Sequence, residues 1–325
     1  MSKIKILDCT LRDGGYINNW EFGKNTIQTI IGTLSDAGID KIEYGFYSEN
    51  SDFDDNYAII NNPQKLSNIN NQSKITLMAN FGQTTFSNII NTKIEIRLAF
   101  KPKDLINIEK VLSEFNKKNI PYSLNAMHIA LYSQNELDKL INISNNNNPQ
   151  CLTAVDTMGI LTENDTNKIF EYIDSKLNKN TALGLHSHNN LDLSFKNTLQ
   201  LLKLKLDRNI FIDSCIGGIA RGGGILNTIE ITEYLNKNYN NSYNADLLND
   251  LHQKYIVPIT KDSDFTDKYP YYLSAKYKCH PNYAKYLKQQ NFSYDKMEQI
   301  LSLIPNKERY NYSEKIIKHT ITKKA

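Results

Sequence analysis

Short runs of apolar and β-branched residues recur along the first two-thirds of the chain, each bounded by polar or turn-forming residues. Runs of about four to eight such residues are typical of buried β-strands. They cover residues 3–8, 41–46, 74–80, 94–100, 121–127, 151–156, 182–188 and 209–215. We expect each run to form one strand.

Most of the segments between these runs have apolar residues at the spacing of an amphipathic helix. The expected helices cover residues 25–38, 103–119, 133–144, 162–179, 193–205 and 222–237. The third unit is the weakest, because only residues 82–92 separate two expected strands. Strand and helix alternating in this order predict an α/β fold, a (β/α)₈ TIM barrel.

An open, doubly wound sheet is the alternative arrangement. Such a sheet usually carries a glycine-rich G-x-G-x-x-G turn after its first strand. Here the segment after the first strand reads CTLRDGGYINNW (9–20), which lacks that spacing. The barrel is therefore the preferred interpretation.

The last part of the chain shows no alternation of strands and helices. Its apolar spacing predicts helices over residues 246–259, 280–290 and 293–304, after an asparagine-rich segment at 236–244. We expect two domains: a catalytic barrel over residues 1–240 and a small helical domain over residues 241–325.

The composition narrows the class of protein. The 325 residues carry a net charge of only +3, which is too small to favour nucleic acid or an anionic membrane as a partner. We expect no signal peptide or membrane span, and a cytoplasmic location. The four cysteines are far apart, so neither a disulfide framework nor a zinc knuckle is indicated.

Polar residues at the ends of the expected strands are the candidates for chemistry, because TIM-barrel active sites lie there. The segment GLHSHNN (184–190) places His186 and His188 two positions apart, and side chains at that spacing share one face of a strand. With a carboxylate from the end of the first strand, they would form a three-ligand metal site. Such ligands suit Mn²⁺, Mg²⁺, Fe²⁺ or Co²⁺, whereas zinc more often has a tetrahedral site. Two histidines held by local hydrogen bonds are the alternative.

Five segments together resemble a known family. They are LDCTLRDGG (7–15), IEYGF (42–46), VDTMG (155–159), GLHSHNN (184–190) and the glycine-rich turn at 217–224. The chain resembles the metal-dependent aldolase, lyase and acyltransferase barrels of the HMG-CoA lyase-like superfamily, which includes the pyruvate carboxyltransferase domain. The start LRDGG and the helical tail are most similar to the 4-hydroxy-2-oxovalerate aldolase branch.

The resemblance implies a metal site and an activity. Asp13, His186 and His188 would bind a divalent metal, with Mn²⁺ preferred and Mg²⁺, Co²⁺ or Zn²⁺ as alternatives. Arg12 would lie beside a bound 2-oxo acid, and Glu43 is a further catalytic candidate or a support for the site. The implied reaction joins or separates the enolate of pyruvate, or of another 2-oxo acid, and an aldehyde. Homodimerisation and an aldehyde dehydrogenase partner are further expectations of the branch.

Two departures from the family pattern bear on mechanism. Tyr16 stands where the aldolase branch has the histidine that is thought to be the base, and a tyrosine is a poorer base at neutral pH. The proton step could instead use a metal-bound water or a group from the tyrosine-rich segment 269–287, which contains His280. Ile225 follows Gly224 where the family often has an asparagine, so we expect only three protein ligands.

Two other functions stay open at this stage. A Claisen-type acyltransferase that uses acetyl-CoA and a 2-oxo acid would usually carry T-L-R-D-G-E-Q, which DGGYINN (13–19) does not match. A non-catalytic barrel that binds the metal and a 2-oxo acid is the other alternative. Tyr16 and Ile225 are the residues that suggest it.

Overall fold

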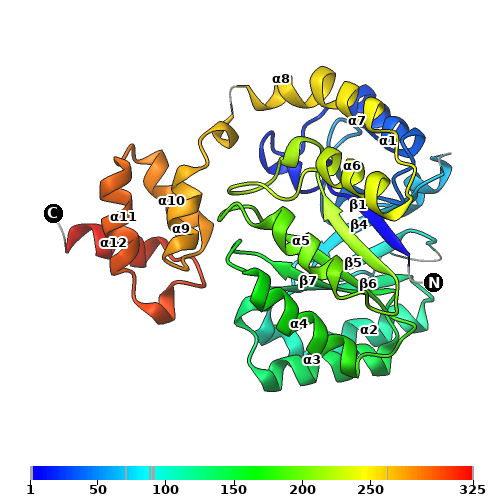
Figure 1. Cartoon of the computed structure of the whole chain (residues 1–325), viewed down its shortest axis with the longest axis horizontal. Coiled ribbons are helices and arrows are strands. Elements are labelled where there is room, and N and C mark those ends of the chain that lie inside the picture. Colours follow the sequence, from blue (N-terminus) through cyan, green and yellow to red (C-terminus); the bar gives the residue numbers. More distant parts are fainter. Residues whose placement is uncertain (1–2, 70–71, 88, 90–91, 262, 324–325) are drawn as a thin grey trace.

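A closed barrel of parallel strands forms the larger part of the molecule (Figure 1). The computed structural model describes residues 3–69, 72–87, 89, 92–261 and 263–323. Eight parallel strands close the barrel among these residues: β1 (Ile4–Asp8), β2 (Lys41–Tyr47), β4 (Lys74–Asn80), β5 (Glu95–Phe100), β6 (Tyr122–Met127), β7 (Cys151–Asp156), β8 (Ala182–Ser187) and β9 (Ile210–Ser214). β1 pairs with both β9 and β2, which closes the sheet on itself. The expected TIM barrel is confirmed.

Helices cover the outside of the barrel. They are α1 (Lys24–Asp36), α2 (Ile108–Lys117), α3 (Gln134–Asn147), α4 (Glu163–Lys176), α5 (Ser194–Lys203) and α6 (Thr228–Tyr239). Local chemistry fixes where several of them begin. Ser133 and Glu136 form a reciprocal capping box at the start of α3, and Thr162 and Asp165 form another at α4.

Two positions around the barrel depart from the regular pattern. Between β2 and β4 the chain forms the short strand β3 (Ile59–Ile60) and the 3₁₀ helix η2 (Pro63–Asn68). The described residues between β4 and β5 form no helix. This agrees with the weak pattern of the segment 82–92, part of which lies outside the described residues.

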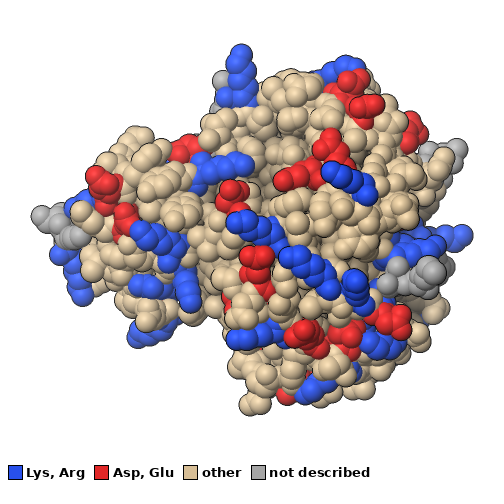
Figure 2. All heavy atoms as spheres, viewed as in Figure 1, with Lys and Arg blue, Asp and Glu red and all other residues tan. Residues whose placement is uncertain are grey.

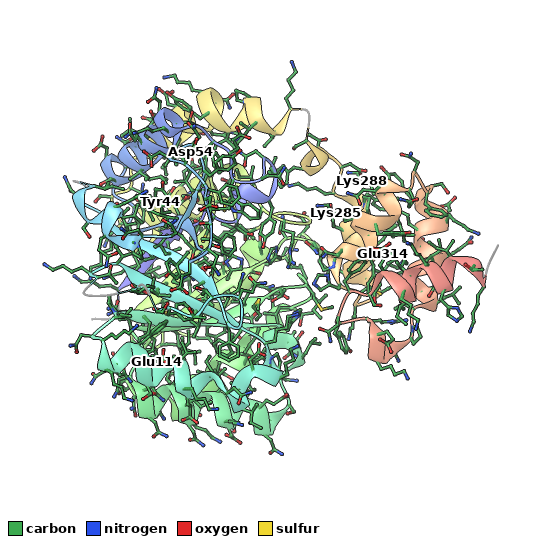
Figure 3. All side chains as sticks on the ribbon, turned by 180° about the vertical axis from the view of Figure 1, so that it is seen from behind. Tyr44, Asp54, Glu114, Lys285, Lys288 and Glu314 are labelled. Atoms are coloured by element: carbon green, nitrogen blue, oxygen red, sulfur yellow. The ribbon has the colours of Figure 1, made fainter. Side chains whose placement is uncertain are left out.

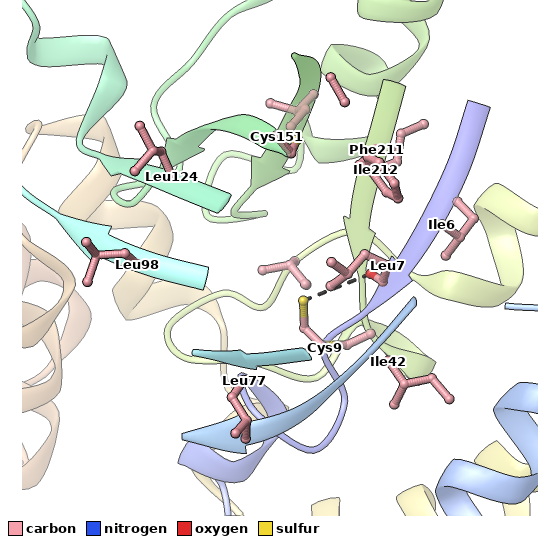
Figure 4. Packing of buried hydrophobic residues seen from close by; sticks show 14 of the residues in the cluster. Ile6, Leu7, Cys9, Ile42, Leu77, Leu98, Leu124, Cys151, Phe211 and Ile212 are labelled. Carbon is pink, nitrogen blue, oxygen red and sulfur yellow. Dashed lines mark hydrogen bonds between the residues drawn. The ribbon is translucent and has the colours of Figure 1, made fainter. Parts of the chain in front are cut away.

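The core has an apolar outer layer and a polar centre. Ile6, Ile42, Leu77, Leu98 and Leu124 belong to the buried apolar cluster around the strands (Figure 4). Ion pairs occupy the barrel interior instead. At one level, Lys41 Nζ donates to Glu95 Oε2, and both side chains are buried. At the next level, Arg97 forms ion pairs with both Glu43 and Asp213.

The C-terminal part of the chain has two sections. In the first, α7 (Ala245–Leu251), a π-helical turn (His252–Ile256) and α8 (Val257–Thr260) follow the barrel, and Leu248, Leu251 and Ile256 join its core. In the second, α9 (Tyr269–Lys276), α10 (Pro281–Gln289), α11 (Tyr294–Leu303) and α12 (Glu314–Thr322) surround a separate apolar cluster. We call this second section, residues 269–322, the lobe.

The lobe stands at one side of the barrel (Figure 1). Because α7 and α8 share the barrel core, we propose that the domain boundary lies near residue 261 rather than at residue 241. Lys and Arg are interspersed with Asp and Glu on the face shown in Figure 2. No helix among the described residues is long and apolar enough to span a bilayer.

Candidate metal centre

The turn after β1 positions the first candidate ligand. The backbone N–H groups of Arg12 and Asp13 both donate to Cys9 O, at 3.0 and 2.7 Å, so the chain folds back at the barrel mouth. Trp20 Nε1 donates to Arg12 O at 2.7 Å and fixes the far side of the turn. The Asp13 side chain is buried as a result.

β8 supplies the other two candidate ligands. His186 lies in the strand and His188 just beyond it, and their ring centroids are 5.2 Å apart. One ligand atom from each of Asp13, His186 and His188 lies within 4.8 Å of the other two, and all three residues are buried. The strand spacing therefore brings both imidazoles to the carboxylate, as the sequence predicted.

Asp213 on β9 orients the His186 ring. His186 Nδ1 lies 3.0 Å from Asp213 Oδ2, while Nε2 lies 3.1 Å from Asp13 Oδ2. If Nδ1 carries the proton and donates to Asp213, Nε2 is left with a lone pair that faces Asp13. Arg97 Nη2 in turn donates to Asp213 Oδ2 at 2.5 Å.

Glu43 completes a ring of alternating charges. Its two oxygens accept from Arg97 Nη1 at 2.9 Å and from Arg12 Nε at 2.6 Å, and Arg12 Nη1 lies 3.2 Å from Asp13 Oδ1. Every member of the ring is buried. Buried charges need partners of this kind, and removing one leaves an uncompensated charge.

The protonation states of Asp13 and His188 suit a cation. Burial would raise the pKa of Asp13, but the Arg12 guanidinium and the neighbouring imidazoles hold it well below its usual range. Burial lowers the pKa of His188 to about 3, so its ring is neutral at neutral pH. At His186, burial lowers the pKa, but the hydrogen bonds and charges of Asp13 and Asp213 raise it above its ordinary value. Asp13 Oδ2 is buried and has no hydrogen-bond partner. An unpaired carboxylate oxygen between two imidazoles fits a divalent metal ion.

A second group of potential ligands fits a metal less well. Cys9, His186 and Asp213 also lie close together. Burial raises the pKa of the Cys9 thiol well above its ordinary value, so it stays protonated. Asp213 is already engaged by Arg97. Because thiolate is the form that binds metal, we assign no site to this group.

A small cavity of about 80 Å³ opens above the candidate ligands. Its described lining residues are Arg12, Asp13, Tyr16, Phe46, Met78, Asn80, Ala99, Asn125, Met127, Val155, Thr157, His186, His188 and Arg221. The cavity therefore gathers Arg12, Tyr16 and all three ligand candidates. Glu43 is not among the described lining residues, because it lies behind Arg12.

The glycine-rich turn closes one side of this cavity. Asn190 Oδ1 accepts from Gly223 N at 2.9 Å, and Asn190 Nδ2 donates to Met158 O at 3.1 Å. His188 also forms a β-bridge with Ile225. The expected helix over 222–237 begins only at Thr228, because Asn227 is its N-cap and Gly222 and Gly224 have positive φ angles. The earlier residues form this turn instead.

Several residues of the site carried no clear sequence signal. Arg97 and Asp213 complete the charge ring, and Arg221, within the glycine-rich turn at 217–224, lines the cavity, but no role was predicted for any of the three from sequence. Asp156, at the end of β7, accepts from Ile160 N and Leu161 N at 3.0 Å each. It thus holds the loop after β7.

Comparison with known proteins identifies the family. The HMGL-like family model matches residues 3–253, which include the whole barrel and α7. The chain belongs to the HMGL-like family, whose members include metal-dependent aldolases and lyases.

Named relatives are 22–24% identical to this chain over the aligned residues. The 4-hydroxy-2-oxovalerate aldolase of Chloroflexus aurantiacus is 24% identical over 294 residues, covering 82% of this chain and 80% of the relative. That of Pseudoalteromonas translucida is 23% identical, covering 68% and 66%. The oxaloacetate decarboxylase of Mycobacterium tuberculosis is 22% identical, covering 67% and 66%.

Solved structures share the fold at low identity. The N-terminal domain of a candidate aldolase from Bacteroides vulgatus superimposes with a TM-score of 0.78 and 23% identity, covering 91% of this chain and 99% of that one. The HMG-CoA lyase from Brucella melitensis gives 0.61 and 13%, covering 81% and 100%. The carboxyl transferase domain of Rhizobium etli pyruvate carboxylase, solved with pyruvate, gives 0.66 and 12%, covering 93% and 56%.

Proposed function

We propose that this protein is a divalent-metal-dependent aldolase, a carbon–carbon lyase that acts on the enolate of pyruvate or another 2-oxo acid and an aldehyde. The observation that carries the proposal is the buried cluster of Asp13, His186 and His188 in one cavity with Arg12. The activities named for the relatives, 4-hydroxy-2-oxovalerate aldolase and oxaloacetate decarboxylase, support it. Both names denote cleavage of a carbon–carbon bond in a 2-oxo acid.

Asp13, His186 and His188 are the proposed metal ligands. One carboxylate and two imidazoles suit Mn²⁺ first, with Mg²⁺, Co²⁺ and Zn²⁺ as alternatives. When bound, the ion supplies Lewis-acid stabilisation of the charge that develops on the enolate oxygen. The orphaned Asp13 oxygen and the neutral His188 ring support this ligand set.

Arg12 is the proposed partner of the 2-oxo acid. Its Nε and Nη1 groups face Glu43 and Asp13, which leaves Nη2 to donate to a substrate oxygen in the cavity. Although burial opposes the charge, the neighbouring carboxylates raise the Arg12 pKa well above its ordinary value. The guanidinium is thus a fixed positive charge where negative charge develops.

Glu43 is proposed as a positioning residue for Arg12. It is fully buried, and Arg12 and Arg97 occupy its two oxygens. In this position it holds the guanidinium plane of Arg12 rather than exchanging protons with substrate.

Tyr16 is the proposed proton-transfer group at the open side of the cavity. Its side chain is 39% exposed and packs edge-to-face on Trp20 and Phe46. A hydroxyl at this rim can donate to, or accept from, the oxygen of the entering aldehyde.

Turnover with a panel of aldehydes tests this function. Purified protein with Mn²⁺, pyruvate and each aldehyde should consume pyruvate, and EDTA should abolish that consumption. Tyr16→Phe should lower kcat by about 10²-fold or more, the usual contribution of a positioned proton-transfer group. Tyr239→Phe, at an exposed tyrosine on α6, is the matched control.

An inert wild type would overturn the aldolase proposal. If that inert protein still bound Mn²⁺ and pyruvate, a non-catalytic binding subunit would be the better description. A homodimer and an aldehyde dehydrogenase partner are proposals that rest on the same family branch. Size-exclusion chromatography with light scattering tests the first, and co-purification tests the second.

A further inference from the structure

Arg221 occupies an unusual position between two cavities. It lines the small cavity above the candidate ligands and also a larger one, of about 500 Å³, between the barrel mouth and the lobe. Its Nη2 donates to Thr157 O at 3.2 Å, and its guanidinium lies 6.0 Å from the Tyr16 ring centroid. Within the described part of the chain, no carboxylate lies within ion-pair distance of Arg221. Its positive charge is therefore available to a ligand.

The loop that carries Arg221 is held tightly. Asn190 accepts from Gly223 N, and a Cβ on Gly223 would lie only 2.9 Å from Asn190 Cα. Gly224 O accepts from Asn189 N at 2.7 Å. Asn189 and Asn190 directly follow His188, so the loop is fixed to the same segment as a proposed metal ligand. Arg221 is therefore positioned relative to the metal site.

The lobe presents further donors to the larger cavity. Lys285 on α10 lines this cavity, on the side of the lobe that faces the barrel (Figure 3). No ion pair joins it to a carboxylate among the residues described. His280, at the start of α10, lies with its ring centroid 6.2 Å from that of His128 on the barrel.

The proposed reaction centre reaches charge neutrality without the positive charge of Arg221. The ring holds the carboxylates of Asp13, Glu43 and Asp213 and the guanidiniums of Arg12 and Arg97, so its net charge is one negative. The imidazoles must be neutral to bind metal. A divalent ion and the carboxylate of one 2-oxo acid then bring the centre to neutrality. No carboxylate of this ring is then left over to pair with Arg221.

We propose that Arg221, with Lys285 across the larger cavity, binds an anionic group of the aldehyde substrate. The group is a carboxylate or a phosphate, and both accept several hydrogen bonds from such donors. The aldehyde carbon would lie in the small cavity near Tyr16, and the anion would extend toward the lobe. This inference rests on the proposed function and names the class of its second substrate.

Matched pairs of aldehydes test the inference with the full-length, Mn²⁺-loaded protein. Butanal is paired with succinic semialdehyde, and glyceraldehyde with glyceraldehyde 3-phosphate. We expect kcat/KM to favour the anionic member of at least one pair by about tenfold or more. The pair with the larger preference distinguishes a carboxylate from a phosphate.

Substitution at the proposed site should remove the preference. In Arg221→Gln, the ratio of kcat/KM for the anionic member to kcat/KM for the neutral member should fall by about tenfold or more. The same ratio should also fall in Lys285→Gln. Lys237→Gln makes the same change of charge at an exposed position on α6 and should leave the ratio unchanged. A wild type without preference, or a preference that survives in Arg221→Gln, overturns the inference.

Two further measurements separate this inference from the proposed function. Deuterium exchange into the pyruvate methyl group reports enolisation without any aldehyde, so exchange without anion preference overturns only the inference. If no exchange occurs, the proposed function fails, and calorimetric titration with inorganic phosphate and with succinate still tests the site. Binding that is lost in Arg221→Gln supports the anion site, and equal binding or no binding by both proteins overturns it.

Discussion

At the candidate metal centre, two of the three candidate ligands, His186 and Asp13, have a charged neighbour that holds them in place. Asp213 faces the ring nitrogen of His186 that is turned away from Asp13, and Arg12 lies against Asp13 itself. Such outer contacts fix the orientation of a metal ligand and the ring nitrogen that it presents. The affinity of the site should therefore depend on residues that do not touch the ion.

Asp213→Asn tests this dependence. The amide can still face His186 Nδ1, but Arg97 loses its charged partner and the His186 ring loses a carboxylate acceptor. We expect the Kd for Mn²⁺, measured by isothermal titration calorimetry, to rise by about 10- to 100-fold. Asp246→Asn, at an exposed residue of α7, should leave the Kd unchanged. An unchanged Kd in a folded Asp213→Asn protein would contradict the proposed role.

Asp156→Asn tests a buried carboxyl that holds a loop. Burial raises the pKa of Asp156 from 3.8 to about 6, so the folded protein binds this proton more tightly than the unfolded chain does. Its contribution to stability is present below pH 3.8 and is lost as the pH rises to 6. This loss amounts to about 3 kcal/mol in the free energy of unfolding.

Urea unfolding with EDTA at pH 4 and pH 7 measures this effect. The stability of Asp156→Asn relative to wild type should be about 2 kcal/mol more favourable at pH 7 than at pH 4, because at pH 4 the unfolded carboxyl is already partly ionised. Asp8, whose pKa burial also raises to about 6, is present in both proteins and cancels in the comparison. An equal difference at the two pH values would show that Asp156 does not titrate in this way.

At this scale, the candidate ligands could be predicted from the sequence more readily than the residues that hold them. Asp13, His186 and His188 lie in short motifs whose spacing indicates their chemistry, and the structure brings them together. Arg97 and Asp213 are 116 positions apart, on strands β5 and β9, and each looks like an ordinary charged residue in its own segment. Only closure of the barrel places them beside each other.

Among the elements, the segment between β9 and α6 connects the candidate metal centre to the rest of the fold. Apolar spacing predicted that the helix would begin at residue 222, but glycine backbone geometry delays its start to Thr228. Residues 222–227, which precede the helix, belong to the turn that follows Arg221. Ile225 in this turn forms a β-bridge with His188. Helical periodicity alone could not separate this turn from the helix, because its apolar residues continue the same pattern.

A pair of glycine substitutions tests the importance of this turn. A Cβ on Gly223 would lie 2.9 Å from both Asn190 Cα and Asn190 Oδ1, whereas a Cβ on Gly32 in α1 would meet nothing within 4 Å. Gly223→Ala should destabilise the protein by about 1–3 kcal/mol and weaken Mn²⁺ binding. Gly32→Ala should be neutral or stabilise it by up to about 1 kcal/mol.

Thermal unfolding of both variants, with and without Mn²⁺, checks this expectation. Gly223→Ala should show a lower Tm and a smaller increase in Tm on addition of Mn²⁺. The Gly32→Ala protein should keep the full increase, since α1 is remote from the ligands. Equal behaviour of the two variants would mean that the turn tolerates a side chain and does not constrain His188.

Over the whole molecule, the barrel holds the candidate metal centre, and the lobe adds groups around the opening of the barrel. Strand order, barrel closure and the helical character of the tail could be predicted from sequence, because periodicity is a local property. The position of the lobe could not, since it depends on contacts such as that between His128 and His280. The larger cavity could not be predicted from the sequence either, because residues far apart in the chain line it: Tyr16, Arg221 and Lys285.

Deuterium exchange into pyruvate tests the central claim most directly. With Mn²⁺ bound, as verified by metal analysis, the protein should exchange the methyl protons of pyruvate in D₂O, as followed by mass spectrometry. EDTA should stop the exchange, and Asp13→Asn should not support it, because Asp13 supplies the carboxylate between the two imidazoles. A wild type that holds Mn²⁺ and binds pyruvate but leaves the methyl group unlabelled would contradict enolate formation at this site.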